Sequence, residues 1–313
     1  MPTGSRQIVS SLIVGLLAAL GHPAEAGEAF ERCLSNKLAA EDAAAACAAA
    51  LRAPDLTETM RIVALSRRAD MYKKLGRFDA ALADYNAALA IAPRYVPTLV
   101  NRGRFYRQTG ELSKALNDVD VALIIDPEYF LAYYVRGQLY LDAGNMDQAH
   151  QDLSTSIKLE PNLFEAYYAR SQIHRKRGEF GKARGDLDRV LELAPEHADA
   201  YHARDMVGAR QHKVGAALVG VGRALSLQPR NPVYLTTRAR LHMHTGDLRR
   251  ALEDLIQAIA ADADHAAAYF NRSRVYRRRG ETRLAIRDLK KAYAIDPGNP
   301  EITRAMRENG LAR

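Results

Sequence analysis

The chain has 313 residues, of which 48% are hydrophobic and 26% are charged. This composition excludes a disordered tail and supplies enough apolar side chains for one large domain or two ordinary ones. The 45 basic residues outnumber the 37 acidic ones, and the formal charge of +8 favours acidic partners without specifying one.

The first 26 residues have the organisation of a secretory signal peptide. Arg6 precedes an apolar run over residues 8–20, and Ala24 and Ala26 form an A-x-A cleavage site. The run is too short to span a bilayer comfortably, although an uncleaved anchor is the alternative. No later stretch of the sequence is long and apolar enough to span. We therefore expect a periplasmic or secreted protein whose mature chain has no integral membrane segment.

Residues 27–61 are expected to form a hairpin of two short helices that meet near residues 39–42. They contain both cysteines of the chain, Cys33 and Cys47. Disulfides persist in exported proteins, and two cysteines that face each other across a helical hairpin can form one. In the chain-entropy model the bond would stabilise the fold by about 3 kcal/mol. The alternative is two buried small side chains, and the spacing excludes a CxxC redox site.

Residues 62–299 repeat with a period of 34 residues, which gives seven units. One position of the unit is always alanine: Ala81, Ala115, Ala149, Ala183, Ala217, Ala251 and Ala285. A second position holds glycine in all units but one, where His212 stands: Gly76, Gly110, Gly144, Gly178, Gly246 and Gly280. A third holds proline except at Ala263: Pro93, Pro127, Pro161, Pro195, Pro229 and Pro297.

Each unit is predicted to be a pair of helices. Apolar residues recur at spacings of three and four, which is the helical period. Gly76 would end the first helix of its unit because glycine accepts the left-handed conformation, and Pro93 would stop the second. Small residues such as Gly103 and Gly137 would meet the alanines and allow the two helices to approach closely.

These residues together resemble the tetratricopeptide-repeat family. The resemblance covers residues 62–299 and implies an all-α solenoid, a right-handed superhelix of helical hairpins whose first helices line a concave groove. In this family such a groove usually binds a peptide or helix of another protein. Residues 27–61 and a helix within residues 300–313 would then cap the two ends of the stack, which otherwise expose apolar surface.

A series of arginines in the first helices matches a series of aspartates sixteen residues later in the second helices. The arginines are Arg68, Arg102, Arg136, Arg170, Arg204, Arg238 and Arg272. The aspartates are Asp84, Asp118, Asp152, Asp186, Asp254 and Asp288, with Gly220 in the fifth unit. We expect bidentate pairs that run through the stack as a ladder, with ligand binding as the alternative role of the arginines. As exposed pairs, each would contribute only about 0–1 kcal/mol.

A second group of basic and aromatic residues falls on the first-helix face that this family uses as its groove. The candidate groove residues are Lys73, Arg104, Arg107, Tyr134, Tyr168, Arg175, Arg240, Phe270, Arg274, Arg277 and Arg278. A basic surface with aromatic side chains would attract an acidic peptide or polymer. The alternative is a solvated charged face without a ligand.

The best-known clamp of the family holds a terminal carboxylate with lysine, asparagine and arginine. The matching positions here are Ser66, Asp70, Asn101, Leu131 and Val135, and only Asn101 fits. We therefore do not expect this protein to bind chaperone tails.

The fifth unit departs most from the pattern. Asp205 replaces a small residue, Gly208 replaces an aromatic residue, and His212 replaces the helix-ending glycine. Glycines within its second helix weaken that helix. The departure is either tolerated drift or a hinge between the two halves of the chain.

No motif in the sequence indicates an enzyme, a metal site or a cofactor. His242 and His244 are two residues apart on a helix, so they point to different faces. We expect a non-enzymatic scaffold without cofactor, metal or nucleic acid, which binds an acidic peptide or helix of a protein partner. The alternative is a cell-envelope assembly or regulatory factor that recognises an acidic non-protein polymer. The sequence does not indicate the oligomeric state.

Overall fold

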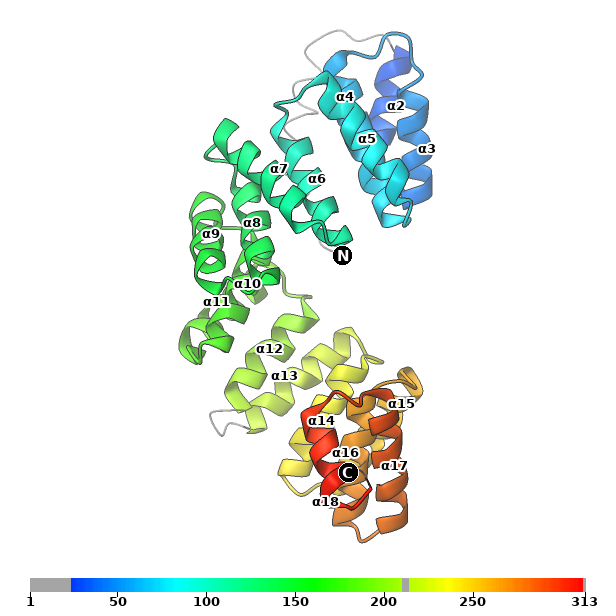
Figure 1. The fold of residues 1–313 in the computed structure, drawn as a ribbon, viewed down its shortest axis with the longest axis vertical. Coiled ribbons are helices and arrows are strands. Elements are labelled where there is room, and N and C mark those ends of the chain that lie inside the picture. The colour runs from blue at the N-terminus through cyan, green and yellow to red at the C-terminus, as the bar shows by residue number, and fades with distance from the viewer. Residues whose placement is uncertain (1–23, 210–213, 312–313) are drawn as a thin grey trace. The chain divides into compact units, whose positions relative to one another are not determined.

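The computed structural model describes residues 24–209 and 214–311, which contain helices and no strands (Figure 1). The prediction of an all-α fold is therefore confirmed for these residues. The predicted signal peptide lies outside the described residues except for its last three. None of the described helices combines the length and apolarity that a membrane crossing would need. The chain divides into two compact units, residues 1–173 and residues 174–313.

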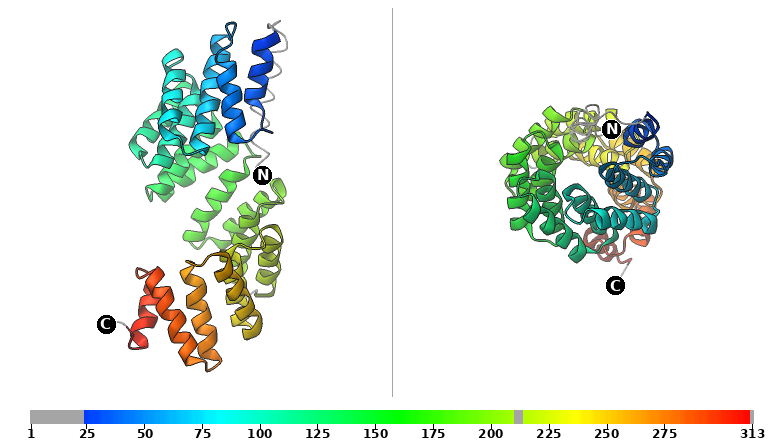
Figure 2. Two further views of the ribbon diagram at one scale, coloured as in Figure 1. Left: turned by 90° about the vertical axis from the view of Figure 1, so that its right-hand side faces the viewer. Right: turned by 90° about the horizontal axis from the view of Figure 1, so that it is seen from above.

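Unit 1 consists of consecutive antiparallel helix pairs, which Figure 2 shows from two further directions. Its helices are α2 (Ala24–Leu34), α3 (Ala40–Ala50), α4 (Glu58–Lys74), α5 (Phe78–Ile91), α6 (Val96–Thr109), α7 (Leu112–Ile125), α8 (Phe130–Asp142), α9 (Met146–Leu159) and most of α10 (Phe164–Lys176). The first helices α4, α6 and α8 contact one another in sequence, so they form one continuous face.

Unit 2 has the same construction. Its helices are α11 (Phe180–Leu193), α12 (Ala198–Ala209), α13 (Val214–Leu227), α14 (Pro232–His244), α15 (Leu248–Ala261), α16 (Ala266–Arg278), α17 (Thr282–Ile295) and α18 (Pro300–Glu308). The first helices α14 and α16 are in contact, and α18 packs on α17. The right-handed superhelix along the whole chain stays a prediction, because the two units are not placed relative to each other.

Glycine and small residues act as the sequence predicts. Gly110 follows α6 with a φ of 82°, and the other described glycines of that series also have positive φ. A Cβ atom added to Gly103 would lie 2.8 Å from a methyl group of Val119 on α7. Only glycine therefore allows α6 and α7 to pack this closely.

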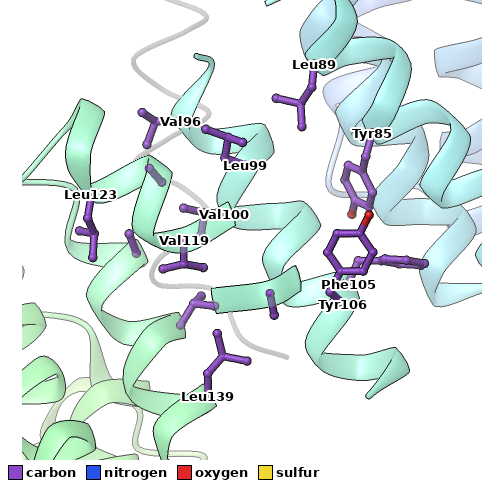
Figure 3. Close-up of a cluster of buried hydrophobic side chains, with 14 of the residues drawn as sticks. Tyr85, Leu89, Val96, Leu99, Val100, Phe105, Tyr106, Val119, Leu123 and Leu139 are labelled. Carbon is purple, nitrogen blue, oxygen red and sulfur yellow. The ribbon is translucent and has the colours of Figure 1, made fainter. Parts of the chain in front are cut away.

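The core of unit 1 lies between successive pairs (Figure 3). Tyr85 and Val100 are fully buried, and the rings of Tyr85 and Phe105 are 5.9 Å apart between centroids. Val119 and Leu139 continue this core into the next pair. Because each pair buries its apolar side chains only against its neighbours, no pair would be stable alone.

The predicted arginine–aspartate ladder is present. In five helix pairs the arginine Nε and Nη2 donate to the two carboxylate oxygens over 2.6–3.1 Å: Arg68–Asp84, Arg102–Asp118, Arg136–Asp152, Arg238–Asp254 and Arg272–Asp288. Arg170 and Asp186 belong to different units, so that pair stays a prediction. Arg204, which faces Gly220 in its own pair, instead has its Nη1 3.3 Å from an oxygen of Asp188.

The expectation that these pairs are exposed was wrong. The aspartate side chains of the five pairs are only 2–9% exposed, whereas the arginine side chains are 13–32% exposed. A carboxylate placed this deep needs its partner, because an unpaired buried charge is strongly unfavourable. The tyrosines of the first helices also lie on the guanidinium groups, for example Tyr133 at 5.6 Å from Arg136.

The ladder also links neighbouring pairs, which the sequence analysis did not anticipate. The remaining Nη1 of Arg102 donates to Asn86 over 2.8 Å, and that of Arg136 donates to Asp120 over 2.8 Å. Both acceptors lie on the second helix of the preceding pair. One guanidinium therefore joins three helices.

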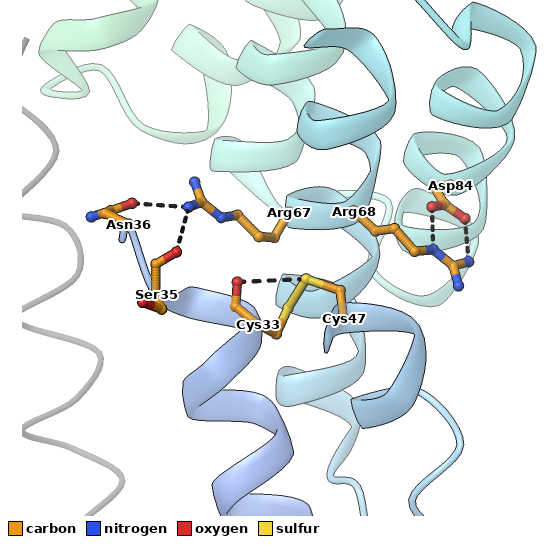
Figure 4. The surroundings of a disulfide bond; sticks show 7 residues. All are labelled: Cys33, Ser35, Asn36, Cys47, Arg67, Arg68 and Asp84. Carbon is orange, nitrogen blue, oxygen red and sulfur yellow. Dashed lines mark hydrogen bonds and ion pairs between the residues drawn. A yellow bond between two sulfur atoms is a disulfide. The ribbon is translucent and has the colours of Figure 1, made fainter. Parts of the chain in front are cut away.

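The N-terminal hairpin is closed by the Cys33–Cys47 disulfide, with 4.4 Å between the Cα atoms (Figure 4). Its turn spans residues 35–39, earlier than the expected 39–42. Both cysteines are fully buried together with Phe30 and Met60, so the hairpin packs on α4.

We predict that Asp152→Asn destabilises the fold much more than Asp120→Asn, although both carboxylates accept from Arg136. The Asp152 side chain is 8% exposed, and losing its charge should reduce the free energy of unfolding by about 3 kcal/mol. The Asp120 side chain is 49% exposed, so its loss should cost at most about 1 kcal/mol. Urea unfolding followed by circular dichroism measures both values. Equal losses would show that burial does not set the strength of the ladder.

Candidate binding cavities on the first helices

Unit 1 contains a cavity of about 510 Å³, here called the unit 1 cavity, which is lined mainly by α4, α6 and α8. It brings together three predicted groove residues, Lys73, Arg104 and Tyr134. Aromatic side chains form much of its wall, including Tyr95 and Tyr129. The cavity is therefore both aromatic and charged.

Asp70 compensates the positive charge of the unit 1 cavity. Its carboxylate accepts from Lys73 over 3.1 Å, from the Tyr85 hydroxyl over 2.6 Å and from Asn101 over 3.4 Å. Burial would raise the pKa of Asp70, but Lys73, Tyr85 and Arg104 together hold it below its usual value. The aspartate is thus a stable anion among these cations.

The tyrosines of the unit 1 cavity are neutral at physiological pH. Burial, followed by the neighbouring Glu165, raises the pKa of Tyr134 to about 12 despite the opposing charges of Arg104 and Arg107. Burial also raises the pKa of Tyr129 to about 12. These rings can pack against a ligand, and their hydroxyl groups can donate or accept hydrogen bonds.

The disulfide-bonded hairpin supplies one edge of the unit 1 cavity. Leu34, which directly follows Cys33, and Asn36 in the turn after it belong to its lining. Arg67 of α4 donates to Asn36 over 2.9 Å and to the carbonyl of Ser35 over 3.4 Å (Figure 4). The disulfide therefore helps to hold this edge in place.

Unit 2 contains a cavity of about 550 Å³, here called the unit 2 cavity, between side chains of α12, α14 and α16. It brings together the predicted residues Arg240, Arg274 and Arg278. No carboxylate is present among the described side chains that line it. Its apolar wall is formed by Met206, Leu241 and Met243.

The three arginines of the unit 2 cavity differ in the contacts that they make with other residues of the protein. Arg278 donates to the carbonyl of Met243 over 2.7 Å. Arg274 lies over the ring of Phe270 at 5.8 Å. Arg240 and Arg274 are exposed, and neither makes a hydrogen bond or ion pair with another described residue. Two guanidinium groups are therefore available to an anionic ligand.

The remaining candidate residues lie outside the lining of both cavities. Arg107 is engaged with Gln138 and Asp142 of α8, and Arg277 donates to Asn309 over 2.6 Å. Tyr168 is half-buried on α10, and Phe270 packs towards α17 and α18.

Arg175 belongs to the electrostatic surroundings of His202 in unit 2. Burial, followed by the charges of Arg175 and Arg240, lowers the pKa of His202 against an opposing effect of Asp199. The imidazole is consequently uncharged at neutral pH, and its Nε2 lies 3.0 Å from the Thr237 hydroxyl oxygen.

Two important residues were missed or misread from sequence. Asp70 was considered only as a mismatch to the carboxylate clamp, although it pairs with Lys73 and accepts from Tyr85 and Asn101 at the unit 1 cavity. Asn271 lines the unit 2 cavity and was not considered at all. The 34-residue period could have identified both, because it places Asp70 in register with Arg240 and Asn101 in register with Asn271.

The described residues contain no cluster of three or more histidine, cysteine, aspartate or glutamate side chains that could hold a metal ion. The side chains of the two cavities offer charge, hydrogen bonds and apolar contact to a ligand.

Comparison with known families matches the repeated region. A model described as "Tetratricopeptide repeat" matches residues 134–198 and 236–300, and a second model with the same description matches residues 62–95. The matched ranges together cover just over half of the chain. No curated protein sequence matches it.

Solved structures share the fold at low sequence identity. A chain in the crystal structure of the APC/C hetero-tetramer Cut9-Hcn1 matches over 90% of this protein with 16% identity and a TM-score of 0.69. This protein covers 54% of that chain, or about half of its length. PilW, described as a widely conserved type IV pilus biogenesis factor, matches over 67% of this protein and 98% of its own chain (19% identity, TM-score 0.61). Pseudomonas aeruginosa pilF matches over 68% and 97% (15% identity, TM-score 0.60). At such identities these matches show the fold alone.

We predict that Asp70→Asn destabilises the protein at neutral pH and that this effect fades in acid. Folding lowers the pKa of Asp70. The ionised carboxylate therefore stabilises the folded protein fully at a pH above the usual aspartate pKa, and this stabilisation is lost as the pH falls through the pKa of Asp70 in the folded state. At pH 7 the free energy of unfolding should fall by about 1–3 kcal/mol. Urea unfolding at pH 7 and near pH 2 tests this, with the exposed Glu128→Gln as the control. If the difference in the free energy of unfolding between Asp70→Asn and the wild type stayed constant with pH, Asp70 would not be an anion stabilised by folding.

Proposed function

Because the chain belongs to the tetratricopeptide-repeat family, we propose that it is an exported, non-enzymatic adaptor that binds a peptide or helix of a partner protein on the face of its first helices. The fold is consistent with a protein–protein interaction adaptor. Members of the family generally act as non-catalytic scaffolds that bind protein partners, which supports the same proposal.

The proposal rests mainly on the composition of the unit 2 cavity. It collects three arginines from two neighbouring first helices, with no carboxylate among the described lining residues. Like charges that lie close together repel each other, so an anionic ligand would relieve an unfavourable arrangement. The formal charge of +8 would also attract an acidic partner over longer distances.

The unit 1 cavity supports the binding of a peptide by contacts of another kind. Its lining contains the carboxylates of Asp70 and Glu165 beside its cations, and its wall contains Tyr95, Tyr129 and Tyr134. Such a surface favours apolar and aromatic side chains over a purely anionic group.

Export forms part of the proposal and has its own test. The A-x-A motif at residues 24–26 predicts cleavage after Ala26. N-terminal sequencing of the protein from its native cells should therefore begin at Gly27. A chain that still begins at Met1 and remains in the cytoplasm would contradict export and leave the binding proposal standing.

We predict that charge reversal in the unit 2 cavity abolishes partner capture. The mature protein would be immobilised and exposed to the soluble envelope fraction of its native cells. The wild-type protein should retain a stoichiometric acidic protein that is released by salt, because exposed charges are screened at high ionic strength. Arg240→Glu combined with Arg274→Glu should lose it.

The matched control is Arg283→Glu combined with Lys290→Glu on α17, which makes the same change of charge at two exposed residues outside both cavities. It should retain the partner. Capture of the same protein by the Arg240/Arg274 variant would refute the site. Sedimentation of the wild-type protein with purified wall material, without any captured protein, would instead favour an acidic polymer as the ligand.

A further inference from the structure

The two cavities are built from equivalent positions of the repeat. Asn101 and Arg104 of α6 line the unit 1 cavity, and Asn271 and Arg274 of α16 line the unit 2 cavity. In the sequence, each residue of the second pair follows its counterpart by five periods of 34 residues. In both helices the asparagine and arginine are three residues apart and so share one face.

One equivalent position has opposite charge in the two cavities. Asp70 on α4 lines the unit 1 cavity, and five periods later Arg240 on α14 lines the unit 2 cavity. In unit 1 the carboxylate of Asp70 accepts from Asn101 and lies within electrostatic range of Arg104. In unit 2 the same place adds a third cation. The unit 1 lining therefore includes a carboxylate at this position, whereas the described unit 2 lining contains none.

Asn271 carries a buried hydrogen-bond acceptor for which the described residues supply no donor. Its side chain is only 5% exposed, and its amide nitrogen donates to the carbonyl of Ala267 over 2.8 Å. A carbonyl can only accept, so this contact fixes which end of the side chain is nitrogen and which is oxygen. Its Oδ1 is buried and has no hydrogen-bond partner among the described residues. Because buried polar groups usually have a hydrogen-bond partner, a ligand that donates a hydrogen bond to this oxygen would be favoured.

A ligand that suits this cavity needs three features together. It needs an anionic group for Arg240 and Arg274, a donor for Asn271 Oδ1, and an apolar group for Met206, Leu241 and Met243. A carboxylate alone or an inorganic polyanion lacks the donor. An acidic sugar supplies donors, but the described lining contains no phenylalanine, tyrosine or tryptophan ring on which a sugar could stack, and His244 is its only ring. A peptide with an acidic residue beside an apolar one has all three.

We propose that the unit 2 cavity binds an acidic residue of a partner peptide, with its carboxylate at Arg240 and Arg274, its backbone N–H on Asn271 Oδ1, and a neighbouring apolar side chain against Met206, Leu241 and Met243. The proposal rests on the adaptor function given above and specifies its partner. Arg274 is long and exposed, so it can adjust as the peptide reaches Asn271.

The test uses a fluorescent peptide of alternating leucine and glutamate with an acetylated N-terminus and an amidated C-terminus, and measures its affinity for the mature protein by anisotropy. Replacing glutamate by glutamine should weaken binding by at least about tenfold, because charge-assisted contacts are lost. Methylating the backbone nitrogens of the glutamates keeps the charge and removes the donor, and it should weaken binding by about fivefold to tenfold. A free C-terminal carboxylate should add little if the side-chain carboxylates are what is bound.

Asn271→Leu identifies the acceptor, because leucine has nearly the same shape without the oxygen. In this variant the methylated and unmethylated peptides should bind equally, since the two changes remove the same hydrogen bond. Arg240→Asp, which introduces the residue found at the equivalent position of unit 1, should abolish the preference for glutamate over glutamine. Asp70→Arg in unit 1 should preserve it. Circular dichroism would verify that each variant is folded.

The results separate this proposal from the adaptor function. An effect of N-methylation that persists in Asn271→Leu would overturn the role of Asn271. Failure of the wild-type protein to bind the peptide would overturn the proposed specificity, while capture of a protein partner would still support the adaptor function. Tight binding of polyphosphate, with no binding of the peptide and no captured protein, would overturn both.

Discussion

The bidentate contact between a first-helix arginine and a second-helix aspartate is the interaction on which this architecture depends. Each of the five carboxylates in these bidentate pairs is nearly inaccessible to solvent, and the guanidinium that satisfies it remains partly exposed. The planar fork of arginine makes this possible, because it meets both carboxylate oxygens and leaves a further nitrogen for the preceding pair. In Arg136 that nitrogen reaches Asp120. Apolar packing supplies most of the stability of the stack, while the ladder fixes how neighbouring helices are aligned.

The same regularity explains why the sites differ. A repeat scaffold places equivalent residues on one face, so a single substitution changes the chemistry of a cavity without changing its frame. Asp70 adds a carboxylate that pairs with Lys73 in the unit 1 cavity, whereas Arg240 at the equivalent position adds a cation to the unit 2 cavity, which has no carboxylate among its described lining residues. Binding specificity is thus determined by the few positions that depart from the period.

The sequence was sufficient to predict the helix pairs, the glycine turns and the ladder, because the same pattern occurs repeatedly and each occurrence restricts which faces can meet. It did not reveal the burial of Asp84 or Asp118, since the period defines which residues pair but not how deeply they lie. It also misplaced the N-terminal turn, because the alanine-rich stretch around residues 39–50 has no glycine or proline to mark a boundary.

Of the candidate groove residues, the structure places Lys73, Arg104 and Tyr134 in one cavity and Arg240, Arg274 and Arg278 in another. The engagement of Arg107 by α8 depends on side chains of the next pair, which one unit of the pattern does not contain.

The guanidinium bridge to the preceding pair is not continuous along the chain. Arg102, Arg136, Arg170 and Arg204 each reach a polar side chain on the second helix before them, at Asn86, Asp120, Ser154 and Asp188. The corresponding positions for Arg238 and Arg272 are Gly222 and Ile256, which have no polar side chain to accept the contact. The pairs built on α14 and α16 therefore resist mechanical separation by other contacts, such as that of Arg278 with the carbonyl of Met243.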